Sequence, residues 1–525
     1  MTNGITPRIA PVRLATPAND AEAARFLAQA AFGGDAKSIA NLKAKGYDAW
    51  LNEQFAMSTD IGYWDWMLSK GYAATSSNPS VHNGAEAVLW RKLMRSPDVL
   101  RQRVALALSE IFVVSMVSVT SLWSGYGAAG YMDMLAAHAF GNFRALLEAV
   151  TLSPVMGVYL GTRGNQKGNP ATGRQPDENF AREIMQLFSI GLYKLNPDGS
   201  VKTDASGKAL ESYGLRDVSE LAKVFTGWGF DGQSPTSPEY WRRPMVVRDA
   251  SHATEAKSFL GVTIAADSGA GAGVRDLKIA LDTLFNHPNV GPFIGRQLIQ
   301  RLVSSNPSAA YVQRVAQAFA NNGSGVRGDM KAVLRAILTD VEARSLPQNN
   351  YSGKLREPML RLLQWARTFN AVSASGNWNL RNTSDPDSGL AQSPLRSPTV
   401  FNFFRPGYVP PSGVMTDPSL VAPELQITTE STIIGYANFM QRAINGGYGD
   451  LTPDYTPWLP LAADVVALTT QLNTVLAAGQ ISASNLATIQ NGISDIVIRT
   501  DADRLNRIKA AIMLVMCAPE YLVQK

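Results

Sequence analysis

The stretch SPDVLRQRVALALSEIF, residues 96 to 112, decides the fold class, because its apolar side chains recur at the helical period. The residues on the apolar face are Leu100, Val104, Ala107, Leu108 and Ile111. Ser96 stands where an N-cap is expected, and Pro97 then occupies the first helical position. The segment therefore predicts a helix that packs its apolar stripe against a core.

The helical period returns along much of the chain. It is found at residues 21–32, 142–152, 275–286, 291–303, 308–321, 329–340, 354–371, 460–478 and 502–517. Strand signals are few, and the best surrounds the turn Asn196-Pro197-Asp198-Gly199 in LYKLNPDGSVKTD, residues 192–204. The sequence predicts a mainly α, large multi-helix globular fold with at most a small β-hairpin.

Long stretches rich in Gly, Pro, Ser and Asn separate the helices, at residues 157–176, 228–270, 373–418 and 446–459. Their aromatic residues, Trp228, Tyr240, Trp241, Trp378 and Tyr408, predict ordered loops that pack on the helices. No repeat or clear linker divides the chain, so we expect a single helical unit over 1–525. The alternative is a main helical domain at 1–418 with a C-terminal helical part at 419–525.

Composition narrows the class of protein. Of 525 residues 45% are hydrophobic and 17% charged, which argues against extended disorder. The net charge of +5 is spread without a basic stripe, so no nucleic-acid partner is expected. A single cysteine, Cys517, excludes an internal disulfide and a cysteine metal cluster within one chain.

Residues 111–132 carry no charge over the length of a membrane-spanning helix. Their Ser, Thr and Gly content and a break at Tyr126-Gly127 favour a buried helix followed by a loop, so no membrane span is predicted. The N-terminal residues lack the apolar run of a signal peptide. The chain as given is therefore expected in the cytoplasm, or in the periplasm or outside the cell if a signal peptide was removed.

PDENFAREIMQLF, residues 176–188, predicts a helix capped by Asp177, with Glu178 and Arg182 paired one turn apart. Capping, dipole and pairing account for these three residues without a function. Glu183 instead lies on the flank of the apolar stripe, where a half-buried carboxylate needs a partner.

His252 lies in VVRDASHATEAKSFLG, residues 246–261, close in sequence to Asp249, Glu255 and Lys257. This mixture suits proton transfer or metal binding. A salt-bridge network that anchors the loop is the alternative, because such networks gather the same residue types.

The chain resembles a large bacterial family, domain of unknown function 1800, in the wording and order of four segments. They are PDENFAREIMQLFSIGLY, YGLRDVSELAKVFTGWGF, SHATEAKSFLG and LFNHPNVGPFIGRQL. Four more segments extend the resemblance over nearly the whole chain: RFLAQAAFGG, AFGNFRALLEAVTLSPVMGVYL, SPTVFNFFRPGY and CAPEYLV. It implies a mainly helical fold and members that are often exported. It also implies a gene that often neighbours one for a protein resembling the alkaline phosphatase and sulfatase superfamily.

The family pattern, carried over position by position, marks Glu178, Asn179, Ala181, Arg182, Glu183, Leu187, Phe188, Gly191, Asp217, Val218, Thr226, Gly227, Trp228, His252, Lys257, Leu260 and Gly261. This chain departs from it at Gln186 and Ala253, where the family usually has an acid. Both departures remove a carboxylate and argue against an all-acidic metal cluster.

Two functions remain open on this basis. In the first, a hydrolase-like enzyme acts on an envelope or extracellular saccharide or ester. Its general acid and base, or its ligands for a divalent metal, come from Glu178, Glu183, Asp217 and His252. Its substrate-binding residues are Arg182, Asn179, Lys257 and Trp228. In the second, the same residues form a buried network in a non-enzymatic helical scaffold or accessory protein that partners an exported phosphatase/sulfatase-like protein.

Overall fold

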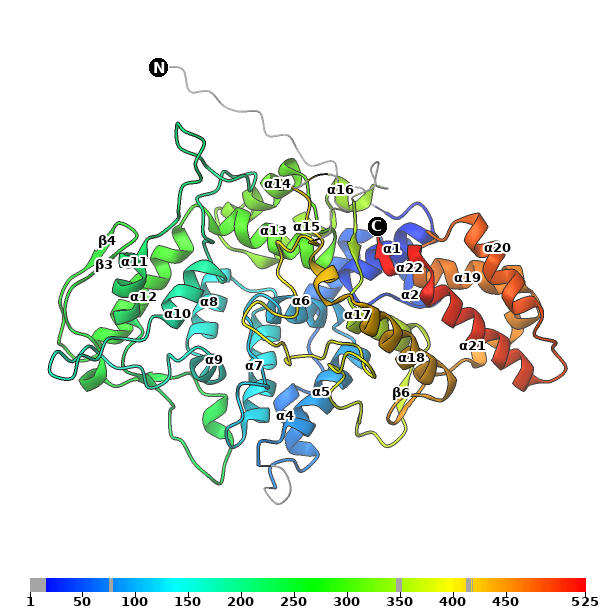
Figure 1. The fold of residues 1–525 in the computed structure, drawn as a ribbon, viewed down its shortest axis with the longest axis horizontal. Helices are drawn as coiled ribbons and strands as arrows, with labels where there is room; N and C mark the ends of the chain where they lie inside the picture. Colours follow the sequence, from blue (N-terminus) through cyan, green and yellow to red (C-terminus); the bar gives the residue numbers. More distant parts are fainter. Residues whose placement is uncertain (1–15, 75–78, 346–351, 412–416, 418) are drawn as a thin grey trace.

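The computed structural model describes residues 16–74, 79–345, 352–411, 417 and 419–525, and helices dominate it (Figure 1). The helices of the first part are α1 (Asp20–Ala30), α2 (Ala36–Lys45), α3 (Tyr47–Ala56), α4 (Tyr63–Ser69), α5 (His82–Arg95), α6 (Val99–Ser109), α7 (Ser124–His138), α8 (Phe143–Thr151) and α9 (Pro154–Tyr159). The middle of the chain forms α10 (Asn179–Gln186), α11 (Leu215–Val224), α12 (Ala272–Asn286), α13 (Val290–Leu302), α14 (Ala309–Ala320), α15 (Met330–Leu338), α16 (Val341–Arg344) and α17 (Pro358–Thr368). The last part forms α18 (Glu430–Gly446), α19 (Val465–Ala477), α20 (Ala483–Ser494), α21 (Asp501–Cys517) and α22 (Pro519–Leu522).

The strands are short and occur in antiparallel pairs. The pairs are β1 (Trp228–Gly229) with β2 (Val246–Val247), β3 (Lys257–Phe259) with β4 (Val262–Ile264), β5 (Lys354–Leu355) with β8 (Val523–Gln524), and β6 (Val372–Ser373) with β7 (Leu451–Thr452). Four 3₁₀ helices are described: η1 (Glu239–Trp241), η2 (Asp249–Ser251), η3 (Pro423–Ile427) and η4 (Thr456–Ala463). The mainly α prediction is confirmed. The turn at 196–199 is also confirmed, by a hydrogen bond from the Asn196 N–H to the Ser200 carbonyl, but isolated bridges replace continuous strands there.

The helices predicted from periodicity all form, with shifted ends where other contacts compete. The apolar face of 96–112 is buried as expected, but α6 begins at Val99 because Ser96 ends α5 instead of capping α6. The helix expected from residue 354 begins at Pro358, since Lys354 and Leu355 pair with β8 at the end of the chain.

The break predicted at Tyr126-Gly127 is wrong, because both residues lie inside α7. A Cβ atom on Gly127 would lie 2.7 Å from the ring of Trp241, so this glycine allows the helix to approach η1 closely. Residues 110–123 instead form the turns between α6 and α7. Among the described residues, no helix combines the length and apolar character needed to cross a membrane.

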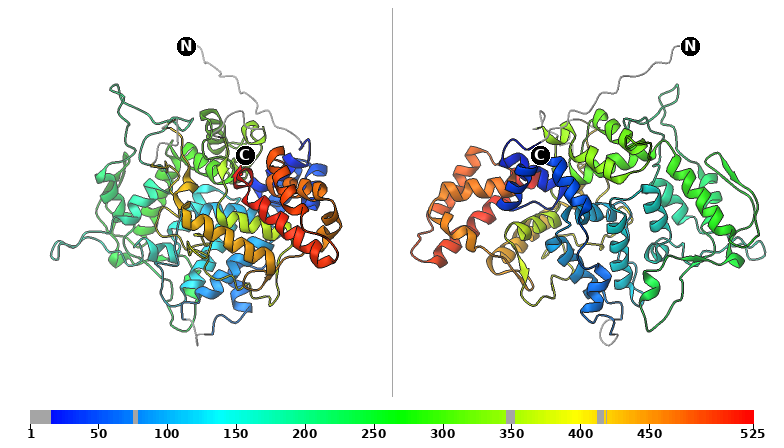
Figure 2. Two further views of the ribbon diagram at one scale, coloured as in Figure 1. Left: turned by 45° about the vertical axis from the view of Figure 1, so that its right-hand side comes forward. Right: turned by 180° about the vertical axis from the view of Figure 1, so that it is seen from behind.

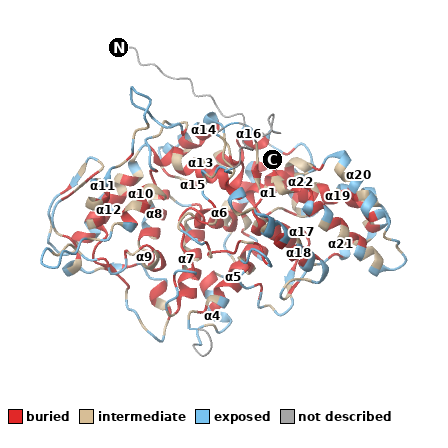
Figure 3. Cartoon of the chain, viewed as in Figure 1, coloured by how far each residue is buried: buried red, intermediate tan, exposed pale blue. Residues whose placement is uncertain are grey.

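The described residues of the long loops pack on the helices. Four of their aromatic side chains are buried, as the composition of the loops predicted: Trp228, Tyr240, Trp241 and Trp378. The buried side chains form one continuous cluster that follows the helices across the molecule (Figure 3). In this cluster α1 packs against α19, so helices from the first and last parts of the chain are neighbours (Figure 2).

Six buried charged side chains, the central ion network, cross the middle of this core: Arg103, Glu110, Arg301, Lys354, Glu357 and Glu424. Lys354 lies 3.1 Å from Glu424 and 3.5 Å from Glu357, and the Arg103 guanidinium donates to the Arg301 carbonyl at 2.6 Å. Burial alone would raise the pKa of Glu357, but Lys354 and Arg103 outweigh it and lower that pKa. Three acidic and three basic side chains thus lie together inside the core.

Ion pairs and strand pairs join residues on the two sides of 418, the alternative domain boundary. Lys354 pairs with Glu424, β5 with β8, and β6 with β7. The single-unit organisation stays a prediction, and truncation tests it.

A chain that ends at residue 418 is expected not to fold cooperatively, because it loses the partner of Lys354, the partner of β5 and the helix that covers α1. The full chain is expected to unfold in one thermal transition, followed by near-ultraviolet circular dichroism. A truncated chain with a native spectrum and its own cooperative transition would support two domains instead.

Candidate functional site

The start of α10 carries the first group of predicted site residues. Glu178 lies at the cap position, one residue later than the cap expected at Asp177, and Asp177 Oδ1 accepts the Asn179 N–H at 2.8 Å. Arg182 donates to Glu178 at 3.1 Å, and both side chains remain partly exposed. The Asn179 side chain donates to the Leu160 carbonyl at 3.3 Å, so it holds the preceding loop. The predicted pairing of Glu178 with Arg182 is confirmed.

Glu183 is more buried than its position on the flank of the stripe suggested, with 7% of its surface exposed. Its Oε2 atom is buried without a hydrogen-bond partner. Burial raises the pKa of Glu183, and the nearby Arg182 offsets this only in part. Burial, together with the charge of Glu183, raises the pKa of Tyr159 to about 12. A carboxyl group with a raised pKa thus lies close to a tyrosine.

His252 lies in a closed polar cluster, with 1% of its surface exposed. Nδ1 lies 2.9 Å from the Thr226 carbonyl, and Nε2 lies 3.1 Å from Asp276 Oδ2. Both ring nitrogens therefore lie against oxygen atoms of the protein. Lys257, also buried, lies 2.7 Å from the same oxygen of Asp276. His252, Lys257 and Asp276 therefore form one buried triad that ties the segment 249–257 to α12.

The sequence did not point to Asp276, which is 2% exposed. Burial alone would raise the pKa of Asp276, but hydrogen bonds from His252 and Lys257 outweigh it and lower that pKa. The three ammonium protons of Lys257 are used by Asp276 and by the carbonyls of Ala253 and Glu255. This leaves Lys257 no proton for a substrate anion in this arrangement.

Asp217 and Trp228 also make local structural contacts. Asp217 accepts the Gly214 N–H at 2.8 Å, at the start of α11, and the Leu260 N–H at 2.7 Å, in the turn between β3 and β4. Trp228 is buried, and its indole N–H donates to the Val224 carbonyl at 3.2 Å. Asp217 therefore fixes one hairpin to one helix end.

The structure does not bring the four predicted catalytic residues into one hydrogen-bonded group. Glu178 bonds to Arg182, Asp217 to two backbone N–H groups, and His252 to Asp276. Within the described part of the chain, no group of three or more His, Cys, Asp and Glu residues is placed to hold a metal ion.

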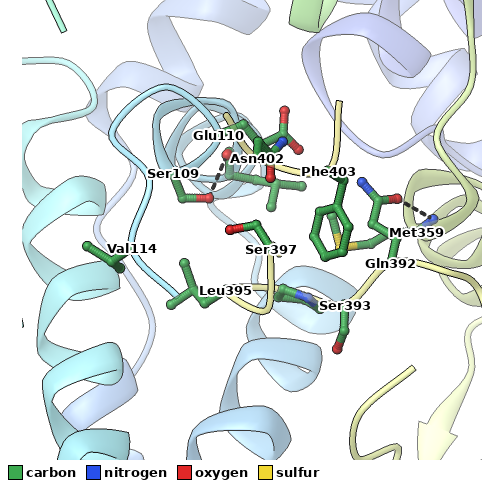
Figure 4. A pocket seen from close by; sticks show the side chains of 12 residues that line it. Ser109, Glu110, Val114, Met359, Gln392, Ser393, Leu395, Ser397, Asn402 and Phe403 are labelled. Atoms are coloured by element: carbon green, nitrogen blue, oxygen red, sulfur yellow. Dashed lines mark hydrogen bonds between the residues drawn. The ribbon is translucent and has the colours of Figure 1, made fainter. Parts of the chain in front are cut away.

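A small cavity that the sequence did not single out lies beside Glu110, between the end of α6 and the segment 392–403 (Figure 4). Its volume is about 10 Å³, which is room for about one water molecule. Both carboxyl oxygens of Glu110, the hydroxyls of Ser393 and Ser397, and Asn402 Nδ2 are buried there without a hydrogen-bond partner. Burial and the neighbouring Glu357 raise the pKa of Glu110 well above its usual range.

The motif SPTVFNFFRPGY, residues 397–408, was a signal that could have located this cavity, because Ser397, Asn402 and Phe403 line it. Glu110 could not be found in the same way, since it lies at the end of a helix whose other residues have the pattern of a buried structural helix.

Comparison with known proteins agrees with the resemblance seen in the sequence. Residues 25–523 match the model of a single family, described as a protein of unknown function (DUF1800). No curated protein and no solved structure matches the chain. Since the family model spans nearly the full length, the protein belongs to the DUF1800 family.

Proposed function

We propose that the protein is a non-enzymatic helical scaffold or accessory protein for an exported phosphatase/sulfatase-like partner. The observation that carries the proposal is the closed triad of His252, Lys257 and Asp276, whose side chains are at most 3% exposed. A general base must reach the proton that it removes, and His252 instead directs both ring nitrogens at protein acceptors. The partner itself rests on the gene neighbourhood that the family resemblance implies.

The triad binds together segments that the family pattern shares. The loop that carries His252 and Lys257 meets α12 through Asp276, and Thr226, at the end of α11, accepts from His252 and from the Ala253 N–H. Asp217 adds the contact between α11 and the β3–β4 turn. These polar residues therefore hold α11, α12 and the segment between them in a fixed arrangement, which a scaffold requires.

Replacing His252 with alanine is expected to lower the free energy of unfolding by about 3 kcal/mol, because it leaves Asp276 and the Thr226 carbonyl short of a buried donor. Chemical denaturation measures the change. Arg216→Gln is the control, since Arg216 is exposed on α11 and its loss should cost less than about 0.5 kcal/mol.

The scaffold proposal also predicts that wild type and Arg216→Gln copurify with the exported phosphatase/sulfatase-like protein when the two are expressed together. His252→Ala should lose this partner only at temperatures at which it unfolds. A His252→Ala protein of unchanged stability that has lost a biological activity would contradict the structural role.

Acid should weaken the triad in a defined direction. Because hydrogen bonds from His252 and Lys257 lower the pKa of Asp276, its contribution to stability is present above the unfolded-state pKa of about 3.9. That contribution is lost as the pH falls through the lower pKa of the folded state. The free energy of unfolding, measured by denaturation from neutral pH downward, should fall less between about pH 4 and 2 for Asp276→Asn than for wild type. Identical slopes would show that Asp276 is not ionised in the triad.

Glu183 favours a second candidate function, a hydrolase acting on an envelope saccharide or ester. It is buried, Oε2 has no partner, and burial raises its pKa, which is the direction of shift that a general acid needs. Arg182 lies beside it and is partly exposed, so it could meet an anionic group of the substrate.

Glu183→Gln is expected to remain folded. On any saccharide or ester that the wild type hydrolyses, its hydrolysis rate should be about a hundredfold or more lower, because general acid catalysis contributes about that much. Since a raised pKa makes stability fall as the pH rises above about 4.3, the variant should also be at least as stable as wild type at pH 8. Glu430→Gln is the matched control, because Glu430 is an exposed carboxylate at the start of α18 and lies outside the predicted site. Full activity in Glu183→Gln would rule out this candidate.

A further inference from the structure

Two depressions that meet at Arg163 lie next to the start of α10. The first has a volume of about 490 Å³ and is lined by Gly161 and by the loop that carries Arg163, Arg174 and Asp177. The second has a volume of about 340 Å³ and includes Phe230, Gln233 and Tyr240. Because Arg163 lines both, they form one two-part depression, here called the Arg163 groove, of the size that small organic ligands occupy.

Arg163 is exposed, and its contacts are with neutral groups. Its guanidinium carbon lies 4.3 Å from the centre of the Phe230 ring, and one Nη donates to the Gln233 side-chain carbonyl at 3.4 Å. Stacking on a buried ring fixes the guanidinium plane while leaving its charge uncompensated. A fixed, unpaired guanidinium is suited to an anionic group of a ligand.

The opposite part of the first depression has a second cation of the same kind. Arg174 is exposed, and its Nε donates to the Lys167 carbonyl at 3.1 Å. The Asn169 N–H bonds to the Arg174 carbonyl at 2.9 Å, so the backbone that carries this arginine is held in place. The side-chain amides of Gln166 and Gln175 line the same depression.

Asp177 places one carboxylate on this wall in a defined position. Asn165 holds its backbone on both sides, accepting the Asp177 N–H at 2.9 Å and donating to the Asp177 carbonyl at 3.2 Å. A Cβ atom on Gly161, which has φ of +82°, would lie 2.8 Å from Asp177 Oδ2. Glycine at position 161 therefore leaves room for the carboxylate.

We propose that the Arg163 groove binds an acidic saccharide, with Arg163 and Arg174 on its carboxylate or sulfate groups and with Asp177, Gln166 and Gln175 on its hydroxyls. This goes beyond either proposed function, because a scaffold or an enzyme could use such a site. Amides and a carboxylate accept and donate the neutral hydrogen bonds that sugar hydroxyls need, and guanidinium groups pair with acidic substituents.

A nucleic acid fits the groove less well. Base stacking needs an open aromatic face, but Phe230 is covered by Arg163, and both Phe230 and Tyr240 are buried.

Isothermal titration calorimetry of the full chain with an oligomer of galacturonate tests the proposal, with an uncharged galactose oligomer and a short oligothymidylate as comparison ligands. Wild type should bind the galacturonate oligomer and bind the other two at least about tenfold more weakly. Arg163→Gln and Arg174→Gln should each weaken binding by about tenfold, and the double variant should weaken it further.

Arg499→Gln is the matched control, because Arg499 is exposed in the turn between α20 and α21, at the other end of the molecule (Figure 1). It removes the same charge and should leave binding unchanged. Arg174→Lys keeps the charge and should recover part of the affinity lost in Arg174→Gln.

Three results would overturn the proposal: no binding of the acidic oligomer by wild type, equal binding by the double variant and Arg499→Gln, or equal binding of oligothymidylate. The last result would identify general attraction of polyanions. None of these results depends on hydrolysis or on a protein partner, so they leave both proposed functions to their own tests.

Discussion

Buried charges must be paired, and this constraint holds the centre of the molecule together. Glu110 comes from the end of α6, Arg301 from α13, Lys354 from β5 and Glu424 from η3, so four distant parts of the sequence must arrive together. Glu110 and Arg301 approach only to 3.7 Å, beside a cavity with room for about one water molecule. The apolar core surrounds these side chains, and their contacts join α6, α13, β5 and η3.

The same physical rule explains why the residues of the family pattern are so polar and yet so deeply placed. His252 and Lys257 both meet Asp276 on α12, while Asp217 fixes the β3–β4 turn to α11. Buried ion pairs and caps therefore hold the long loops to the helices, in addition to the buried aromatic side chains of those loops. The exposed guanidinium groups of Arg163 and Arg174 differ, since their charges are not used in that way.

Periodicity in the sequence was sufficient for the fold class and for the main helices, because an amphipathic helix is a local pattern. It failed at Tyr126-Gly127, where the reason for glycine is the ring of Trp241, more than a hundred residues away. The site was predictable only in part, for a similar reason. The pairing of Glu178 with Arg182 is local, whereas the partner of His252 is Asp276, which lies on a helix face and carries no motif. The convergence of Glu110 and Asn402 on one cavity likewise depends on tertiary structure.

The pairing of β5 with β8 has a consequence for the order in which the protein is made. Lys354 and Leu355 leave the ribosome long before Val523 and Gln524, and the Gln524 side chain then donates to the Leu302 carbonyl at 2.9 Å. The middle of the chain must therefore wait for the last strand before its backbone partners are complete. The centre of the fold is therefore completed only by residues at the end of the chain.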